Sequence, residues 1–145
     1  MKASLDTFHI DTMAGVLAVV KKNVTFFQQT KFDFPKDQDF MKKYGGYGLV
    51  YRYLRSKVPL YSNLYEDLTL SKSQLNGLKH DYSEDLIQSD TLMQKYIRDE
   101  IKALQVINDH FNRVVSMYQD LELYYQVRAD VEQFKERLES KQLQK

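Results

Sequence analysis

The C-terminal stretch from Ser89 to Lys141 constrains the fold most, because nothing in its sequence interrupts a helix. Neither Gly nor Pro, the residues that most often end helices, occurs after Gly77. Apolar side chains recur there at steps of three and four, which places them on one helical face. They are Ile97, Ile101, Leu104, Ile107, Phe111, Val114, Tyr118, Leu121, Tyr124, Val127, Val131, Phe134 and Leu138. A helix of about 50 residues is roughly 75 Å long, so its apolar stripe requires cover by other helices or by a partner.

Two further apolar stripes precede this stretch. The first predicts a helix over about residues 11–30, with Asp11 as its N-cap. The second begins at Leu49 and passes Pro59 without changing phase. This continuity favours a continuous helix with a kink over a new helix that starts at Pro59. The members of the second stripe are Val50, Leu54, Val58, Tyr61, Tyr65, Leu68, Leu75 and Leu78.

An irregular connector is predicted between these two helices, over about residues 31–48. Pro35 disfavours helical geometry in the residue before it. A short helical piece over about 37–44 precedes the cluster Gly45-Gly46-Tyr47-Gly48. Because glycine is the strongest local helix breaker after proline, we expect this cluster to end the helix and turn the chain.

The polar segment over residues 81–89 predicts a short connection between the second stripe and the C-terminal stretch. Thr91 and Gln94 have the spacing of a capping box, which predicts a helix that starts near residue 90. Two long stripes with a short connection form an antiparallel hairpin. With its turn near residue 86, this hairpin places Tyr61 opposite Phe111.

The hairpin, predicted over about 49–141, leaves one part of its apolar stripe without cover. This part is Leu123–Leu138, and the first helix is the expected cover. The sequence therefore predicts an all-α fold: an elongated helical bundle of three main helices, built on a long antiparallel helical hairpin, in a single domain over residues 1–145.

Composition restricts the class of protein further. A hydrophobic fraction of 43% in 145 residues supports a folded domain. The balance of 21 basic against 20 acidic residues argues against a dedicated DNA-binding protein. The absence of cysteine excludes disulfides, thiol catalysis and cysteine-ligated zinc. The longest apolar run, Met13–Val20, is too short for a transmembrane segment and has no basic cluster before it, as a signal peptide would.

No motif predicts catalysis, a metal site or a cofactor. The chain has three histidines, and the predicted hairpin separates His80 from His110 by roughly 27 Å. Neither histidine has the Glu-x-x-His or His-Glu-x-x-His spacing of helical metal sites. The glycine cluster is not followed by the Gly-Lys-Ser/Thr of a phosphate-binding loop. We therefore expect a non-enzymatic protein.

Residues 21–57 combine nine Lys or Arg with three Asp, and aromatic residues alternate with the cations. This composition is typical of surfaces that bind single-stranded nucleic acid or an anionic surface. The alternative is that the aromatic residues form core and the lysines add solubility. The candidate partner contacts are Lys42, Lys43, Tyr44, Tyr47 and Tyr51 in this segment, and Tyr124 and Tyr125 in the C-terminal helix.

The run from Leu54 to Ile107 has a characteristic cadence of aromatic, apolar and polar residues. It consists of Tyr61, Leu64, Tyr65, Asp67, Leu68, Gln74, Leu75, Leu78, Lys79, His80, Asp81, Tyr96, Ile97, Glu100 and Leu104. In this cadence the chain resembles uncharacterised exported helical-hairpin proteins of the Bacteroides group. The resemblance implies a periplasmic or surface protein that is made with a signal peptide, and it implies no catalytic residue.

The predicted function follows from the long apolar stripe and the lack of a converging polar site. We expect a non-enzymatic helical scaffold or protein-binding module that engages another protein, or a second copy of itself in a homo-oligomer. The alternative function is binding of nucleic acid or an anionic surface through residues 21–57, with nucleic acid the less favoured partner.

Overall fold

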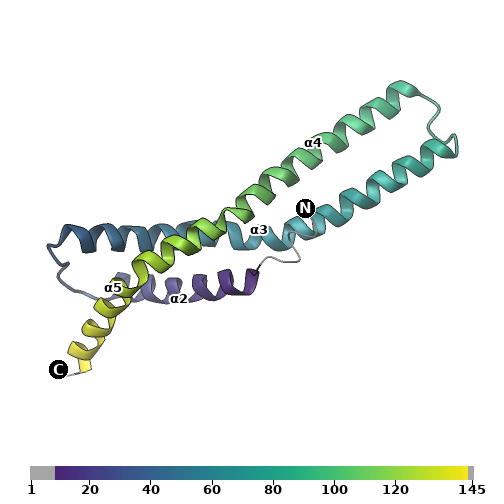
Figure 1. Ribbon diagram of the computed structural model, residues 1–145. Helices are drawn as coiled ribbons and strands as arrows, with labels where there is room; N and C mark the ends of the chain where they lie inside the picture. The colour runs from purple at the N-terminus through teal and green to yellow at the C-terminus, as the bar shows by residue number, and fades with distance from the viewer. Residues whose placement is uncertain (1–8, 144–145) are drawn as a thin grey trace. The chain divides into compact units, whose positions relative to one another are not determined.

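The computed structural model describes residues 9–143, and all regular structure in this range is α-helical (Figure 1). The helices are α2 (Ile10–Gln29), α3 (Gln38–Ser83), α4 (Asp90–Val115) and α5 (Met117–Leu143). The helices pack against each other, and residues 9–143 contain no strand. The predicted all-α class is therefore confirmed. None of these helices has the length and apolar character needed to cross a membrane.

The described chain divides into two compact units. Both α3 and the α4–α5 segment contribute residues to each unit. Residues 59–115 form one unit, which we call the hairpin unit. Residues 9–58 and 116–143 form the other, which we call the three-helix unit. α3 passes through Pro59, at the division, without interruption, as the unchanged phase of its stripe predicts.

In the hairpin unit, the C-terminal part of α3 lies beside α4 and runs in the opposite direction (Figure 1). The Ser71 hydroxyl donates a hydrogen bond to Glu100 Oε2 at 3.4 Å, which agrees with the predicted register to within one residue. The connection follows Ser83, and Asp85 adopts a left-handed conformation with φ of 55°. Asp and Asn tolerate this conformation better than most residues, so the position suits the turn.

The three-helix unit consists of α2, the N-terminal part of α3 and α5. α2 packs against α5, which confirms the predicted role of the first helix as cover. Aromatic rings from all three helices meet at Phe27 on α2. Its ring centroid lies 5.3 Å from that of Tyr44 on α3 and 6.2 Å from that of Phe134 on α5. The buried apolar side chains of this unit are Met13, Val16, Val20, Phe27, Phe40, Tyr47, Val50, Leu54, Met117, Tyr124, Val127 and Val131.

The predicted break at the glycine cluster is wrong, because α3 begins at Gln38 and includes all of these glycines. Asp37 caps its N-terminus by accepting a hydrogen bond from the Asp39 amide at 2.9 Å. The reason for glycine is clear at Gly46, where a Cβ atom would lie 3.2 Å from Val127 Cγ1. The small residue allows α5 to approach α3 closely, and this packing offsets the low helix propensity of glycine.

The structure refines three details of the predicted helices. The C-terminal stretch is helical from Asp90 to Leu143, as predicted, except at the single residue Ser116 between α4 and α5, where Val114-Val115-Ser116 combines β-branched residues with a serine, and these residue types favour helices weakly. Ser89, rather than Thr91, caps α4, since its hydroxyl accepts a hydrogen bond from the Leu92 amide. α2 begins at Ile10, so that Asp11 lies within its first turn, near the positive end of the helix dipole.

Candidate protein-binding surface

Two predicted partner contacts, Tyr47 and Tyr124, lie in the core of the three-helix unit. Tyr47 on α3 is 1% exposed and Tyr124 on α5 is 4% exposed. Their ring centroids are 6.0 Å apart, and both hydroxyl groups donate to Glu132 Oε1, at 3.4 Å from Tyr47 and 3.1 Å from Tyr124. The two tyrosines therefore pack between helices in this structure and are not on its surface.

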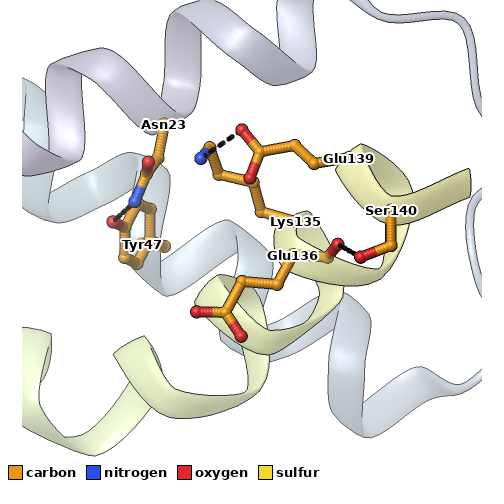
Figure 2. Close-up of polar contacts among 6 residues, drawn as sticks. All are labelled: Asn23, Tyr47, Lys135, Glu136, Glu139 and Ser140. Atoms are coloured by element: carbon orange, nitrogen blue, oxygen red, sulfur yellow. Dashed lines mark hydrogen bonds and ion pairs between the residues drawn. The ribbon is translucent and has the colours of Figure 1, made fainter. Parts of the chain in front are cut away.

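The hydroxyl of Tyr47 is also the centre of a polar network between helices. The Asn23 side-chain amide on α2 donates a hydrogen bond to Tyr47 Oη at 2.7 Å (Figure 2). Burial raises the pKa of Tyr47, and the neighbouring Glu132 carboxylate raises it further. Burial and Glu132 also raise the pKa of Tyr124. Both hydroxyl groups therefore remain protonated and able to donate, which fixes how the three helices meet.

The remaining predicted contacts lie closer to the surface. Lys43 forms ion pairs with Asp39 at 2.8 Å and with Asp130 at 2.9 Å, and its bond to Asp39 contributes most to its raised pKa. Tyr44 is half-buried among aromatic rings, and burial raises its pKa. Lys42 is exposed and Tyr51 is half-buried. Tyr125 is exposed on α5, where the Arg128 guanidinium lies 5.0 Å from its ring centroid.

Several aromatic and basic side chains of residues 21–57 are buried in contacts within the three-helix unit. Its Phe27, Phe40 and Tyr47 are buried. Lys57 on α3 pairs with Asp120 on α5 at 2.6 Å, and both side chains are at least 85% buried. Because base stacking needs exposed rings, this arrangement offers few of the platforms that single-stranded nucleic acid uses.

A different surface stands out in the hairpin unit. Among the apolar side chains exposed or partly exposed in this unit, five lie at helical spacing on α3 and α4: Leu68, Leu75, Ile97, Ile101 and Leu104. We call them the apolar face. Four of the five are 37–49% exposed, with Ile101 the most open. Their spacing, with Ile97, Ile101 and Leu104 at steps of four and three, is that of a helix-packing seam.

The apolar face contains a groove of about 510 Å³ between α3 and α4. Leu68, Leu75 and Leu104 line it together with Tyr65, Ser71 and Lys72, among others. Leu104 and Ile101 also line the adjoining hollow, on the α4 side. Leu104 is common to both hollows, so Leu68, Leu75, Leu104 and Ile101 line one continuous surface across both helices.

The predicted hairpin placed each of these five residues on an apolar stripe that was expected to be covered. What it missed is the width of the apolar sector on α4. Ile107 and Val114 face inward and are buried, whereas Ile97, Ile101 and Leu104 extend the sector beyond them. The spacing of the apolar residues in the sequence already shows that the apolar sector of α4 is wider than one neighbouring helix can cover. This width was the signal that could have indicated the surface.

The polar side chains of the described residues suggest no catalytic or metal centre. Within residues 9–143, no three His, Asp or Glu side chains lie close enough to hold a metal ion. His110 Nδ1 is buried without a hydrogen-bond partner.

Comparison with known proteins adds no assignment: no family model, curated protein or solved structure matches the chain.

Proposed function

We propose that the protein is a non-enzymatic helical scaffold, in which the hairpin unit binds a helical partner through its apolar face. The observation that carries this proposal is the exposure of Ile101 and its neighbours on one continuous surface of α3 and α4. Contiguous apolar patches on proteins usually mark interaction sites, because water-exposed apolar area is costly. Helix-in-groove docking uses such surfaces, and the partner supplies apolar residues at steps of three and four.

The alternative, binding of nucleic acid or an anionic surface through residues 21–57, has weaker support. The cations that contact rings there, Arg52, Arg55 and Lys57, lie 5.3–6.0 Å from the tyrosine rings of their own helix. Lys43 and Lys57 also form ion pairs with carboxylates of α5. These contacts engage four of the nine cations in this segment, Lys43, Arg52, Arg55 and Lys57.

A photo-reactive amino acid in place of Ile101 tests the proposal directly. Irradiation in an extract of the producing cells should join position 101 to another polypeptide, which mass spectrometry then identifies. Val106 provides the matched control, since it is 54% exposed on the same helix and lies about 140° around it from Ile101. Equal adducts at 101 and 106, or none at 101, would contradict the proposal.

A further inference from the structure

The groove between α3 and α4 combines an apolar lining with a single charge. Leu68, Leu75 and Leu104 contribute apolar side chains, and Lys72 is the one charged residue among the described residues that line the groove. A lysine beside apolar surface lays its aliphatic stem against that surface and keeps its ammonium group in water. Lys72 is exposed to solvent. The groove therefore offers a partner both an apolar surface and a positive charge.

A second cation borders the apolar face on α4. Arg98 precedes Ile101 by three residues, a spacing that makes the two side chains neighbours on a helix. The hydrogen bond between Ser71 and Glu100 sets the register of the antiparallel hairpin. In that register, Lys72 lies within one residue of the level of Arg98. The apolar face thus has one cation beside it on each helix, at the same level along the hairpin.

Neither cation is neutralised by a carboxylate in the part of the chain that the structure describes. The positions three and four residues away from Lys72 and from Arg98 hold no Asp or Glu, and neither side chain forms an ion pair with a described residue. In the three-helix unit, by contrast, Lys43, Lys57 and Lys135 each pair with a carboxylate. The two cations beside the apolar face are therefore available to the carboxylates of a partner.

We propose that the occupant of the apolar face is an acidic amphipathic helix of another protein, which has apolar residues at steps of three and four and Asp or Glu on both flanks of that stripe. This inference rests on the proposed function and names the chemistry of its partner. Apolar side chains of the helix pack into the groove, and its carboxylates meet Lys72 and Arg98. The arrangement selects acidic helices, because a basic helix would bring like charges together.

The dimensions of the groove set the length of the partner segment. The residues that line it on α3 run from Tyr65 to Asn76, which is about 17 Å or about three helical turns. Contact along three turns of one helix buries less area than the standard specific interface. Binding therefore depends on the two cations as well as on apolar packing, and we expect it to weaken as salt is added.

The shape of the surface favours a helix over an anionic lipid bilayer, which surfaces with apolar and basic residues also attract. A bilayer presents a flat face, whereas the hollow between α3 and α4 has a volume of about 510 Å³. The row of side chains along a helix fills a groove of this kind. Asn76 also lines the groove, and its amide pairs with polar side chains of a helix but would be left without partners against acyl chains.

The photo-reactive group at position 101 tests this inference when it is combined with charge reversal beside the apolar face. The cross-linked segment that mass spectrometry identifies should carry apolar residues at steps of three and four, with Asp or Glu beside them. Lys72→Glu and Arg98→Glu should each lower the yield of adduct about fivefold, since each replaces an attraction with a repulsion. Lys72→Arg keeps the charge and should retain the yield. The control Lys95→Glu makes the same change of charge on α4, about 120° around the helix from Ile101, and should also retain it.

The outcomes separate this inference from the proposed function. An adduct at position 101 whose yield is the same in the parent, Lys72→Glu and Arg98→Glu would overturn the inference and leave the proposed function standing. A captured segment without Asp or Glu, or one that belongs to this chain, would also overturn the inference. The absence of a polypeptide adduct at position 101, or equal adducts at positions 101 and 106, would overturn both.

The salt dependence of the parent protein gives a measurement that needs no charge variant. The yield of adduct at position 101 should fall as NaCl is raised from about 50 mM to about 500 mM, because the ion pairs at the edge of the groove are screened. A yield that does not change with salt would overturn the inference. Circular dichroism at 222 nm verifies that the charge variants are folded.

Discussion

The three-helix unit and the hairpin unit are built from helices of similar character, yet they bury their apolar residues to very different extents. In the three-helix unit, six apolar side chains are completely buried: Met13, Val20, Val50, Leu54, Met117 and Val131. In the hairpin unit only Leu64 and Val114 are. A third helix lets each apolar stripe face two neighbours, whereas two helices can cover only the line along which they touch.

The same difference extends to polar groups. The three-helix unit places a charged pair and a tyrosine–carboxylate network between its helices, and such groups are tolerated only where partners satisfy them. In the hairpin unit a hydrogen bond from Ser71 to Glu100 joins the two helices near the middle of their length. The three-helix unit therefore buries polar groups together with their partners, whereas the hairpin unit exposes apolar side chains on its surface.

The largest effect is expected for Asp120→Ala in the three-helix unit. The substitution leaves the Lys57 ammonium, 15% exposed at its side chain, without its carboxylate. Removing one member of a buried pair typically costs about 3–4 kcal/mol, because an uncompensated charge stays buried. Urea denaturation followed by circular dichroism measures the loss. Asp130→Ala removes a more exposed carboxylate from Lys43 and should cost less than about 1 kcal/mol; equal losses would show that burial does not distinguish the two pairs.

Leu54→Ala should lower the free energy of unfolding by about 3 kcal/mol, since it removes a fully buried side chain and leaves a cavity. Leu70→Ala in the hairpin unit is the matched control. Leu70 is 58% exposed, so its truncation should change stability by no more than about 0.5 kcal/mol. A comparable loss for both would mean that the hairpin unit has a core as tightly packed as that of its neighbour.

The sequence predicts the features that depend on local apolar spacing, and it does not predict contacts between residues far apart in the chain. The spacing of apolar residues predicts the helices, the hairpin register to within one residue and the cover of α5 by α2. It cannot show that Gly46 lies against Val127, because that contact joins residues far apart in the chain. Tyrosine suits both a wet and a buried position, so composition alone left Tyr47 and Tyr124 as candidates for a surface.

Tyr47→Phe tests the polar network and should cost about 1–2 kcal/mol at neutral pH, since the Asn23 amide loses its acceptor. The pH dependence is a sharper test. The folded state raises the pKa of Tyr47 above its ordinary value of 10.0, so the folded protein holds this proton more tightly than the unfolded chain. Stability is therefore unaffected below about pH 10 and falls as the pH rises beyond it.

Unfolding by urea between pH 8 and pH 11 measures this fall. In Tyr47→Phe the alkaline decline should become shallower, and part of it should remain because Tyr124 also has a raised pKa. Tyr125→Phe is the control, since that ring is exposed on the same helix as Tyr124 and should leave the slope unchanged. An alkaline slope identical in Tyr47→Phe and the parent would show that the hydroxyl of Tyr47 is not held in the buried network.

The smallest change in stability is expected for alanine substitutions at two glycines of α3, which differ in what lies next to them. Gly45→Ala adds a methyl group that would meet no atom within 4 Å apart from its chain neighbours and the adjacent backbone of its own helix, so only helix propensity changes, and stability should rise by about 1 kcal/mol. Gly46→Ala gains the same propensity, but its Cβ would lie 3.2 Å from Val127 Cγ1 and would force α5 away from α3. Its stability should therefore stay at or below that of the parent. Thermal unfolding of both variants measures the difference, and an equal gain would mean that α3 and α5 do not need the close approach. The close approach lets α5 bury Tyr124 and Val127 in the three-helix unit. An equal gain would therefore also weaken the contrast between this well-buried core and the exposed apolar side chains of the hairpin unit.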